Sequence, residues 1–289
     1  LIHDYSEHPE IDLSATARNW ILEKLPWVKN IVLKLRNGST ATEKRGFLIH
    51  GESPDRKILE NNTWYAINLL LNRDASFYLD TRNLRVWLKR NLSGKTVLNT
   101  FAYTGSLGIA ALSGGANRVV QLDRNENFLN LAKKSTELNH INISSKDFVA
   151  KDIFEAVSQY KKNSQFFDCV ILDPPFFSTT NKGIVDLENN NLRLINKVRP
   201  LINDNGWLIT INNALYVNGH DYLKSLEILC MGGYLSIEEL IPIPQDIAGF
   251  NAEIKNIYPT DPSPFNHPTK IAILKIRRKI TQKGIVPLS

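Results

Sequence analysis

The chain has 289 residues, enough for one large domain or for a domain of about 200 residues with a smaller appendage. Hydrophobic residues make up 43% of it, and no window approaches the roughly 18 unbroken apolar residues of a membrane span, which excludes an integral helical membrane protein. The net charge of +6 equals the six basic residues beyond Asp261, where no acidic residue occurs, so the rest of the chain is balanced and the charge alone indicates no nucleic-acid partner. These six are Lys270, Lys275, Arg277, Arg278, Lys279 and Lys283.

The start of the chain lacks the basic residues and the apolar run of a signal peptide. Cys169 and Cys230 are too few and too far apart in sequence to indicate a disulfide framework or a zinc site. We therefore expect a reducing, cytoplasmic setting and no metal. The missing initiator methionine suggests that sequence upstream of Leu1 is absent.

The first 80 residues predict a small α+β region. Apolar spacing predicts a helix over residues 15–25, and short β-type runs predict strands over 31–35, 47–50 and 64–71. We assign residues 1–80 to this region and residues 81–289 to the main domain.

From residue 97 onward, strands and helices alternate. The predicted strands cover residues 97–99, 118–122, 147–150, 167–173, 207–211, 235–243 and 271–276, and the predicted helices lie over 106–112, 128–138, 185–202 and 220–229. Repeated strand–helix units indicate a doubly wound, mostly parallel α/β sheet of seven strands. The last two strands are joined without a helix and are expected to be antiparallel.

The strand over 167–173 runs directly into Asp173, Pro174, Pro175, Phe176 and Phe177. Proline has a fixed φ and no N–H donor, so the strand must stop at Asp173 and leave its carboxylate at the sheet edge. A carboxylate, free carbonyls and an aromatic face together can hold a planar nucleobase. The alternative is a simple strand stop with two core phenylalanines.

The loop after the first strand of the main domain ends in Gly105, which lets the backbone approach a ligand. It is not a G-x-G-x-x-G loop, and its bulky Phe101 and Tyr103 argue against a pyrophosphate cradle. Asp123 ends the second strand, where a carboxylate can accept both ribose hydroxyls, and Asp152 ends the third, within reach of an adenine amino group. Either aspartate could instead be a helix N-cap. Together they favour a nucleoside with a non-phosphate tail, namely S-adenosyl-L-methionine.

With these pieces in place, the chain resembles the class I S-adenosylmethionine-dependent methyltransferases, and more closely the bacterial large-subunit rRNA methyltransferases that make 5-methylcytosine or N7-methylguanine. The matching segments are Phe77-Tyr78-Leu79-Asp80-Thr81-Arg82, the loop from Val97 to Gly105, Gln121-Leu122-Asp123, Asp173-Pro174-Pro175 and His267-Pro268-Thr269-Lys270. This resemblance implies rRNA as the substrate and a Rossmann-like fold.

The resemblance also assigns roles to individual residues. Arg82 would hold the methionine carboxylate, or else be an exposed arginine in the first turn of a helix. The set expected to bind the rest of the cofactor is Asn99, Phe101, Tyr103, Thr104, Gly105, Asp123, Arg124, Asp152, Ile153 and Asp173. The set expected at the acceptor is Asp173, Pro174, Pro175, Phe176 and Asn212.

The chain departs from the 5-methylcytosine branch, because attack on the cytosine ring requires a cysteine that is absent from both expected positions. Cys169 and Cys230 are better explained as small apolar residues. We therefore expect transfer to a nitrogen, with the amides of Asn212 or Asn213 reading the base edge; the alternative for that pair is a turn.

Three functions are compatible with the sequence: an RNA base methyltransferase, a methyltransferase acting on a small molecule or protein, and a non-catalytic cofactor-binding subunit.

The loop over 245–268, with Phe250, Tyr258, Phe265 and His267, is either a lid or an ordered surface excursion. We expect His267 to be structural. No oligomeric state is predicted.

Overall fold

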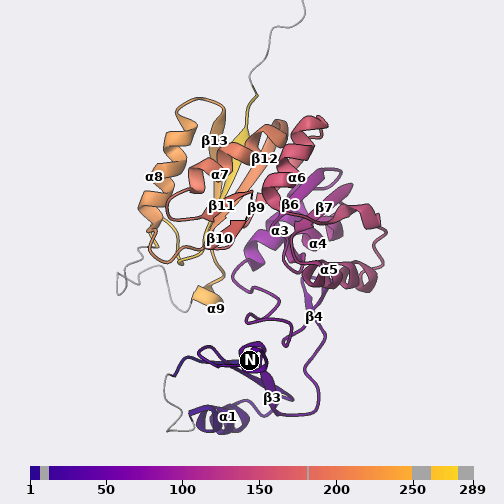
Figure 1. Cartoon of the computed structure of the whole chain (residues 1–289), viewed down its shortest axis with the longest axis vertical. Coiled ribbons are helices and arrows are strands. Elements are labelled where there is room, and N and C mark those ends of the chain that lie inside the picture. Colours follow the sequence, from indigo (N-terminus) through magenta and orange to yellow (C-terminus); the bar gives the residue numbers. More distant parts are fainter. Residues whose placement is uncertain (7–12, 181, 249–261, 279–289) are drawn as a thin grey trace, which may run out of the picture.

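The computed structural model describes residues 1–6, 13–180, 182–248 and 262–278. Its larger part is built around a seven-stranded sheet (Figure 1). In spatial order the strands are β13 (Leu235–Ile241), β14 (Lys270–Ile276), β12 (Ile202–Asn212), β9 (Phe167–Leu172), β6 (Thr96–Thr100), β7 (Arg118–Asp123) and β8 (Phe148–Ala150).

The five strands from β12 to β8 are parallel to one another, and β14 runs antiparallel to both of its neighbours. This confirms the predicted doubly wound sheet with its final antiparallel pair. Because the parallel strands all point the same way, the loops after β6, β7, β8, β9 and β12 meet at one edge of the sheet.

Helices cover both faces of the sheet (Figure 1). They are α3 (Arg82–Asn91), α4 (Ser106–Ser113), α5 (Glu126–Leu138), α6 (Ile153–Lys162), α7 (Asn191–Val198) and α8 (Gly219–Cys230), with 3-10 turns η1 (Ser145–Asp147) and η2 (Arg199–Leu201). Buried residues of α6, α7 and α8 form one core with the sheet, and those of α3 and α4 form the other. In β9, Val170 and Leu172 enter the first core while Cys169 and Ile171 enter the second, which explains its unbroken apolar sequence.

The N-terminal region lies at one end of the molecule (Figure 1). A three-stranded sheet contains β1 (Ile2–Asp4), β2 (Ile31–Leu35) and β3 (Phe47–His50), accompanied by α1 (Leu13–Lys24) and α2 (Ala41–Arg45). A hairpin of β4 (Lys57–Glu60) and β5 (Thr63–Ala66) follows. The amide of Ala66 donates to Ser135 Oγ at 2.9 Å and that of Trp64 to Asn139 Oδ1 at 2.9 Å, so this hairpin is attached to α5 and its C-cap. The domain boundary at residue 80 stays a prediction.

The predicted helix over 185–202 is wrong in its first part, whereas its second part contains α7 and η2. Residues in its first part form the strand β11 (Gly183–Asp186), which pairs with β10 (Phe177–Thr180). The Asp186 carboxylate accepts the amides of Glu188 and Asn189, which closes a turn before α7 begins. Val185 and Leu187 are buried two residues apart, which is the spacing of a strand rather than of a helix.

The strand predicted over 64–71 is shorter, because Asn68 Oδ1 accepts the amide of Leu70 and turns the chain after β5. Beyond β13 the chain forms α9 (Gln245–Ala248). Phe250 and Tyr258 lie outside the described residues, as do Lys279 and Lys283. Among the helices that the structure describes, none combines the length and the apolarity needed to cross a bilayer.

Candidate active site

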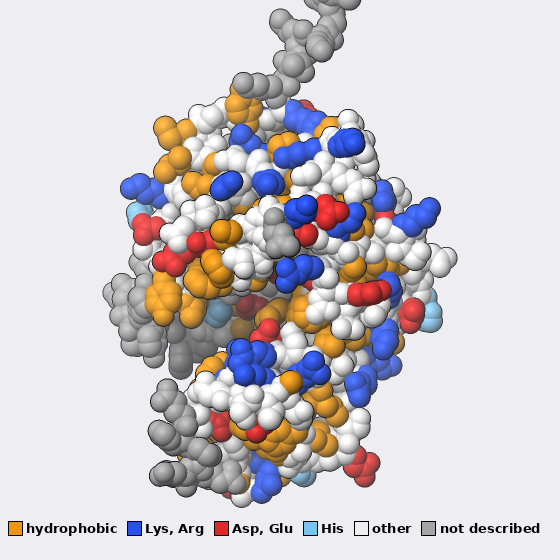
Figure 2. Space-filling view, in the orientation of Figure 1, with side chains coloured by type: hydrophobic (Ala, Val, Ile, Leu, Met, Phe, Trp, Pro, Cys, Tyr) orange, Lys and Arg blue, Asp and Glu red, His pale blue; other side chains and the backbone are white. Residues whose placement is uncertain are grey.

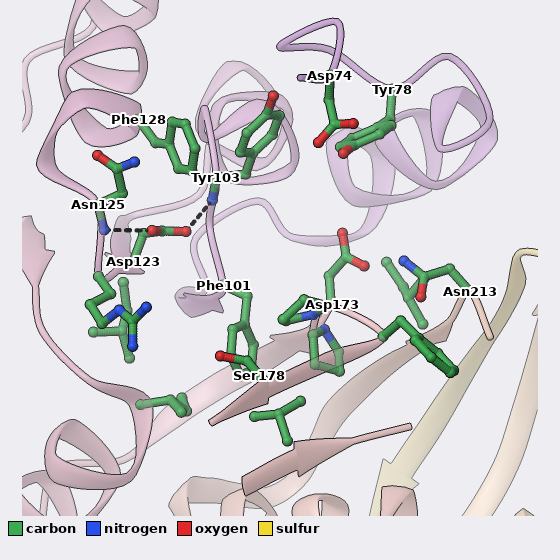
Figure 3. A pocket seen from close by; sticks show the side chains of 18 of the residues that line it. Asp74, Tyr78, Phe101, Tyr103, Asp123, Asn125, Phe128, Asp173, Ser178 and Asn213 are labelled. Carbon is green, nitrogen blue, oxygen red and sulfur yellow. Dashed lines mark hydrogen bonds between the residues drawn. The ribbon is translucent and has the colours of Figure 1, made fainter. Parts of the chain in front are cut away.

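A cavity of about 900 Å³ opens at the edge of the sheet where the parallel strands end. Its walls come from the loops after β6, β7, β8, β9 and β12, and from residues 72–81 before α3. Figure 3 shows Asp123 near one end of this cavity and Asp173 near the other, with Phe101 between them. The cavity therefore lies at the edge of the sheet where the sequence analysis expects the site.

Asp123 is held in place by two backbone amides. Its Oδ2 accepts from the Tyr103 amide at 2.8 Å and its Oδ1 from the Asn125 amide at 2.8 Å (Figure 3). Burial raises the pKa of Asp123, and these hydrogen bonds oppose that rise. The carboxylate therefore stands as an oriented acceptor on the cavity wall.

The loop after β6 folds tightly in front of α4. Gly105 has φ of +80°, and a Cβ there would lie 2.5 Å from the Cβ of Ala132, so glycine is required. Phe101 and Tyr103 also have positive φ, of 52° and 50°, which is uncommon for aromatic residues and is typical of functional loops. Both rings line the cavity, and Tyr103 meets Phe128 edge-on with ring centroids 4.6 Å apart.

Asp152 is the N-cap of α6, as the alternative interpretation had it. Its Oδ1 accepts the amides of Phe154 at 2.8 Å and Glu155 at 3.4 Å. It nevertheless lines the cavity together with Ile153, Arg124 and Lys151. The two basic residues lie at this end of the cavity, beside Asp123.

Asp173 has a different environment. Among the described residues, none donates a hydrogen bond to its carboxylate. Burial raises its pKa to about 7, and the carboxylate of Asp80 contributes to the rise. Asp80 also lines the cavity; its Oδ2 accepts from Thr269 Oγ1 at 2.9 Å, and its buried Oδ1 has no hydrogen-bond partner. These two carboxylates are thus free to accept donors from a ligand.

Aromatic and amide side chains surround Asp173. Phe176 lines the cavity and is 43% exposed, whereas Phe177 belongs to β10, is 57% exposed and does not line it. Pro174 and Pro175 also line the cavity. Across from them, the loop after β12 contributes Asn213 (Figure 3).

Several predicted site residues lie outside the cavity wall. Asn99 is buried and donates to Gln121, Thr104 Oγ1 donates to the Ser76 carbonyl, and Gly105 is the N-cap of α4. They support the cavity loop from behind.

Two further predicted residues are engaged elsewhere. Arg82 begins α3 and forms an ion pair with Asp246 of α9, which makes it a structural arginine in the first turn of a helix. Asn212 is fully buried, and its Oδ1 accepts the Ala214 amide at 3.0 Å. Successive residues of a strand point to opposite sides, so the next asparagine, Asn213, faces the cavity.

Sequence reasoning missed the wall formed by residues 72–81. Asp74 and Tyr78 lie there, facing Asp173 in Figure 3. This segment is tied to the N-terminal sheet: the buried Lys34 of β2 donates from Nζ to the carbonyls of Asn72 at 2.6 Å and Asp74 at 2.8 Å. Within this wall, the sequence analysis had pointed only to the family-like segment 77–82.

On the opposite side, Lys270 is buried and donates to the carbonyls of Ala214 and Pro268. It therefore holds the loop after β12 from inside the protein and is not part of a basic surface. His267 accepts the Thr269 amide through Nδ1, and Phe265 is buried against Tyr222, so neither lies over the cavity.

Both cysteines are free thiols away from the cavity. Cys169 is buried inside the sheet, where burial raises the pKa of its thiol, and Cys230 ends α8. Within the described ranges, no group of three or more His, Cys, Asp or Glu side chains is arranged to hold a metal ion.

Similar proteins identify the family. Residues 16–231 match the family model of S-adenosylmethionine-dependent methyltransferases. The chain is 37% identical to the ribosomal RNA large subunit methyltransferase I of Aeromonas salmonicida over 50% of this chain and 37% of that protein. It is 32% identical to the ribosomal RNA large subunit methyltransferase K/L of Psychrobacter cryohalolentis over 74% of this chain and 25% of that protein.

The chain therefore spans less than half the length of these curated relatives. Among solved structures, SMU.776, described as a methyltransferase complexed with SAH, is similar with a TM-score of 0.77 and 22% identity, over 92% of this chain and 66% of that one. This likeness concerns the fold. Since the family model covers most of the chain and the sheet has the class I arrangement, the chain belongs to the S-adenosylmethionine-dependent methyltransferases.

Proposed function

We propose that this chain transfers a methyl group from S-adenosylmethionine to a base nitrogen of RNA, with rRNA as the substrate. The observation that carries this proposal is the acceptor end of the cavity, where Asp173 and Phe176, three residues apart in sequence, both line the wall and no thiol lines the wall formed by described residues. A hydrogen-bond acceptor beside an aromatic face suits a base that presents N–H groups.

The other end of the cavity fits the cofactor. Asp123 offers an oriented carboxylate for the ribose hydroxyls, and Phe101 and Ile153 offer apolar surface for the adenine. Asp152 uses one carboxylate oxygen as a helix cap and retains the other for an adenine amino group. Arg124 lies beside the ribose site. When bound, the cofactor supplies an activated methyl group on a sulfonium.

The residues of this chain align and desolvate the acceptor nitrogen. Asp173 and the Pro174 carbonyl accept N–H groups of the base, while Pro175 and Phe176 cover its face. Of the two asparagines expected to read the base edge, Asn213 takes that role, and Asn212 holds the loop. Where the target is an exocyclic amine, Asp173 receives its proton; a ring nitrogen needs no base.

The RNA assignment rests on the relatives, which are named as ribosomal RNA large subunit methyltransferases. An rRNA substrate would place the chain in the cytoplasm. A small molecule or a protein remains the second candidate substrate, since the cavity of about 900 Å³ would admit either a small molecule or an extended side chain.

Transfer of labelled methyl groups to rRNA fragments tests the proposal, followed by mass spectrometry of the nucleosides. We expect a base methylated on nitrogen, and an Asp173→Ala variant that binds the cofactor without transferring methyl. A 5-methylcytosine product would contradict the nitrogen assignment. Cofactor binding with no transfer to any RNA, small molecule or protein would identify a non-catalytic subunit.

A further inference from the structure

A second, smaller cavity of about 400 Å³ adjoins the first. The two share Asn72, Asn125 and Phe128 in their walls. The distinctive members of the second are three basic side chains, Lys44, Arg45 and Arg73, and we call this feature the basic recess. No carboxylate is part of its described wall.

The basic side chains come from two separate segments of the N-terminal region. Lys44 and Arg45 form the last turn of α2, whose start is held by a capping box between Thr40 and Glu43. Arg73 is fixed against Arg36, the residue after β2, by two hydrogen bonds. The Arg73 guanidinium donates to the Arg36 carbonyl at 2.9 Å, and the Arg36 guanidinium donates to the Arg73 carbonyl at 2.9 Å.

These cations lack partners of opposite charge within the part of the chain that the structure describes. The described ion pairs involve other basic residues, including Arg36, which lies 3.6 Å from Asp74. Like charges gathered around a concave surface repel one another, and this repulsion is relieved when an anion binds. Figure 2 shows Lys and Arg side chains grouped where the N-terminal region meets the sheet domain, beside the hollow of the main cavity.

The charge of the two cavities is opposite. The acceptor end of the main cavity presents Asp74, Asp80 and Asp173, which disfavour a phosphate. The polar side chains in the described wall of the basic recess are cations and amides, including Asn125 and Asn127 at the start of α5. A nucleotide whose base enters the main cavity can therefore leave its neighbouring phosphates in the recess.

We propose that the basic recess binds backbone phosphates of the RNA strand whose base enters the main cavity. This inference rests on the proposed function and deepens it, since it assigns the N-terminal region to substrate binding. It also makes the RNA contact a local one that adjoins the reaction centre, in a chain whose charge is balanced up to Asp261.

The test replaces the three cations together in a Lys44→Gln, Arg45→Gln, Arg73→Gln variant and measures binding of an rRNA fragment as a function of KCl concentration. For single strands the slope of log K against log salt changes by about 0.7 for each phosphate contact, so we expect a slope smaller in magnitude by up to about 2. The KM for RNA should rise, while kcat and the affinity for the cofactor stay unchanged.

A matched control, Lys161→Gln, Lys162→Gln, Lys224→Gln, removes the same charge from α6 and α8, away from both cavities, and should keep the wild-type slope. The single substitution Arg45→Glu, at an exposed position, guards against misfolding of the triple variant and should also weaken RNA binding.

The outcomes separate this inference from the proposed function. Salt-sensitive RNA binding by wild type with an unchanged slope in the triple variant would overturn the recess and leave the function intact. No RNA binding by wild type would overturn both. Binding of millimolar inorganic phosphate that is lost in the triple variant but does not compete with RNA would assign the recess to a free anion instead, and weaker cofactor binding in the triple variant would assign it to the main cavity.

Discussion

The two ends of the main cavity both present carboxylates, yet they hold them differently. Asp123 accepts two backbone amides at 2.8 Å each, and Asp152 caps a helix. Asp173 receives no hydrogen bond from described residues, and the carboxylate of Asp80 raises its pKa further. Burial raises the pKa of both Asp123 and Asp173; backbone hydrogen bonds oppose the rise at Asp123, whereas the carboxylate of Asp80 adds to it at Asp173. One end is therefore preorganised to bind, and the other is suited to exchange a proton.

Removing the unpaired carboxylate should have the largest effect. We expect Asp173→Ala to lower kcat by about 100-fold or more, because positioning and proton acceptance by one side chain typically contribute that much. Cofactor affinity, measured by calorimetry, should change little. A similar loss of cofactor affinity would mean that Asp173 binds the cofactor, and the two ends of the cavity would then not differ in the way proposed.

Removing the tethered carboxylate should act on binding. Asp123→Ala loses the ribose acceptor and two amide partners, and hydrogen bonds to a charged group contribute about 1.5–3 kcal/mol each, so the Kd for the cofactor should rise by about 10–100-fold. Asp186→Ala is the matched control, since the Asp186 carboxylate also accepts two backbone amides but does not line the cavity. If the control weakens cofactor binding as strongly, the loss reflects the lost amide contacts and not a contact with the ribose.

Aromatic stacking should contribute less. We expect Phe176→Ala to raise the KM for RNA by about 10-fold, within the roughly 1–3 kcal/mol of one base–aromatic stack. Phe177→Ala, one residue further on and outside the cavity, provides the control and should behave as wild type. If Phe177→Ala raised the KM for RNA and Phe176→Ala did not, the stacking residue would be Phe177 of β10.

The smallest expected effect is on how the thermal stability of the protein depends on pH. The pKa of Asp173 is raised from 3.8 to about 7 in the folded state, so its contribution to stability is present below pH 3.8 and is lost as pH rises through 7. Asp173→Asn should therefore raise Tm relative to wild type more at pH 8 than at pH 5, by on the order of 2 °C. An equal difference at both pH values would show that Asp173 is ionised throughout.

The main sheet could be predicted from the sequence because central parallel strands are continuous apolar runs bounded by glycine, proline and aspartate. The strand ends at Asp123, Asp152 and Asp173 followed from the same pattern. The β10–β11 hairpin was missed, and so was the turn after β11, which depends on the side-chain acceptor Asp186 and leaves no apolar signature. The five-residue α2 was too short to show a helical period.

The sequence by itself determined the succession of strands and helices along the chain and the edge of the sheet at which the strand-end carboxylates meet. It also showed that no cysteine stands at the two positions where methylation of a ring carbon needs one. Only the tertiary structure decided which side chains face the cavity: Asn213 rather than Asn212, Asp80 beside Asp173, and Arg82 in an ion pair with Asp246. The reason is that local pattern specifies where a strand stops, whereas these contacts join residues far apart in the chain.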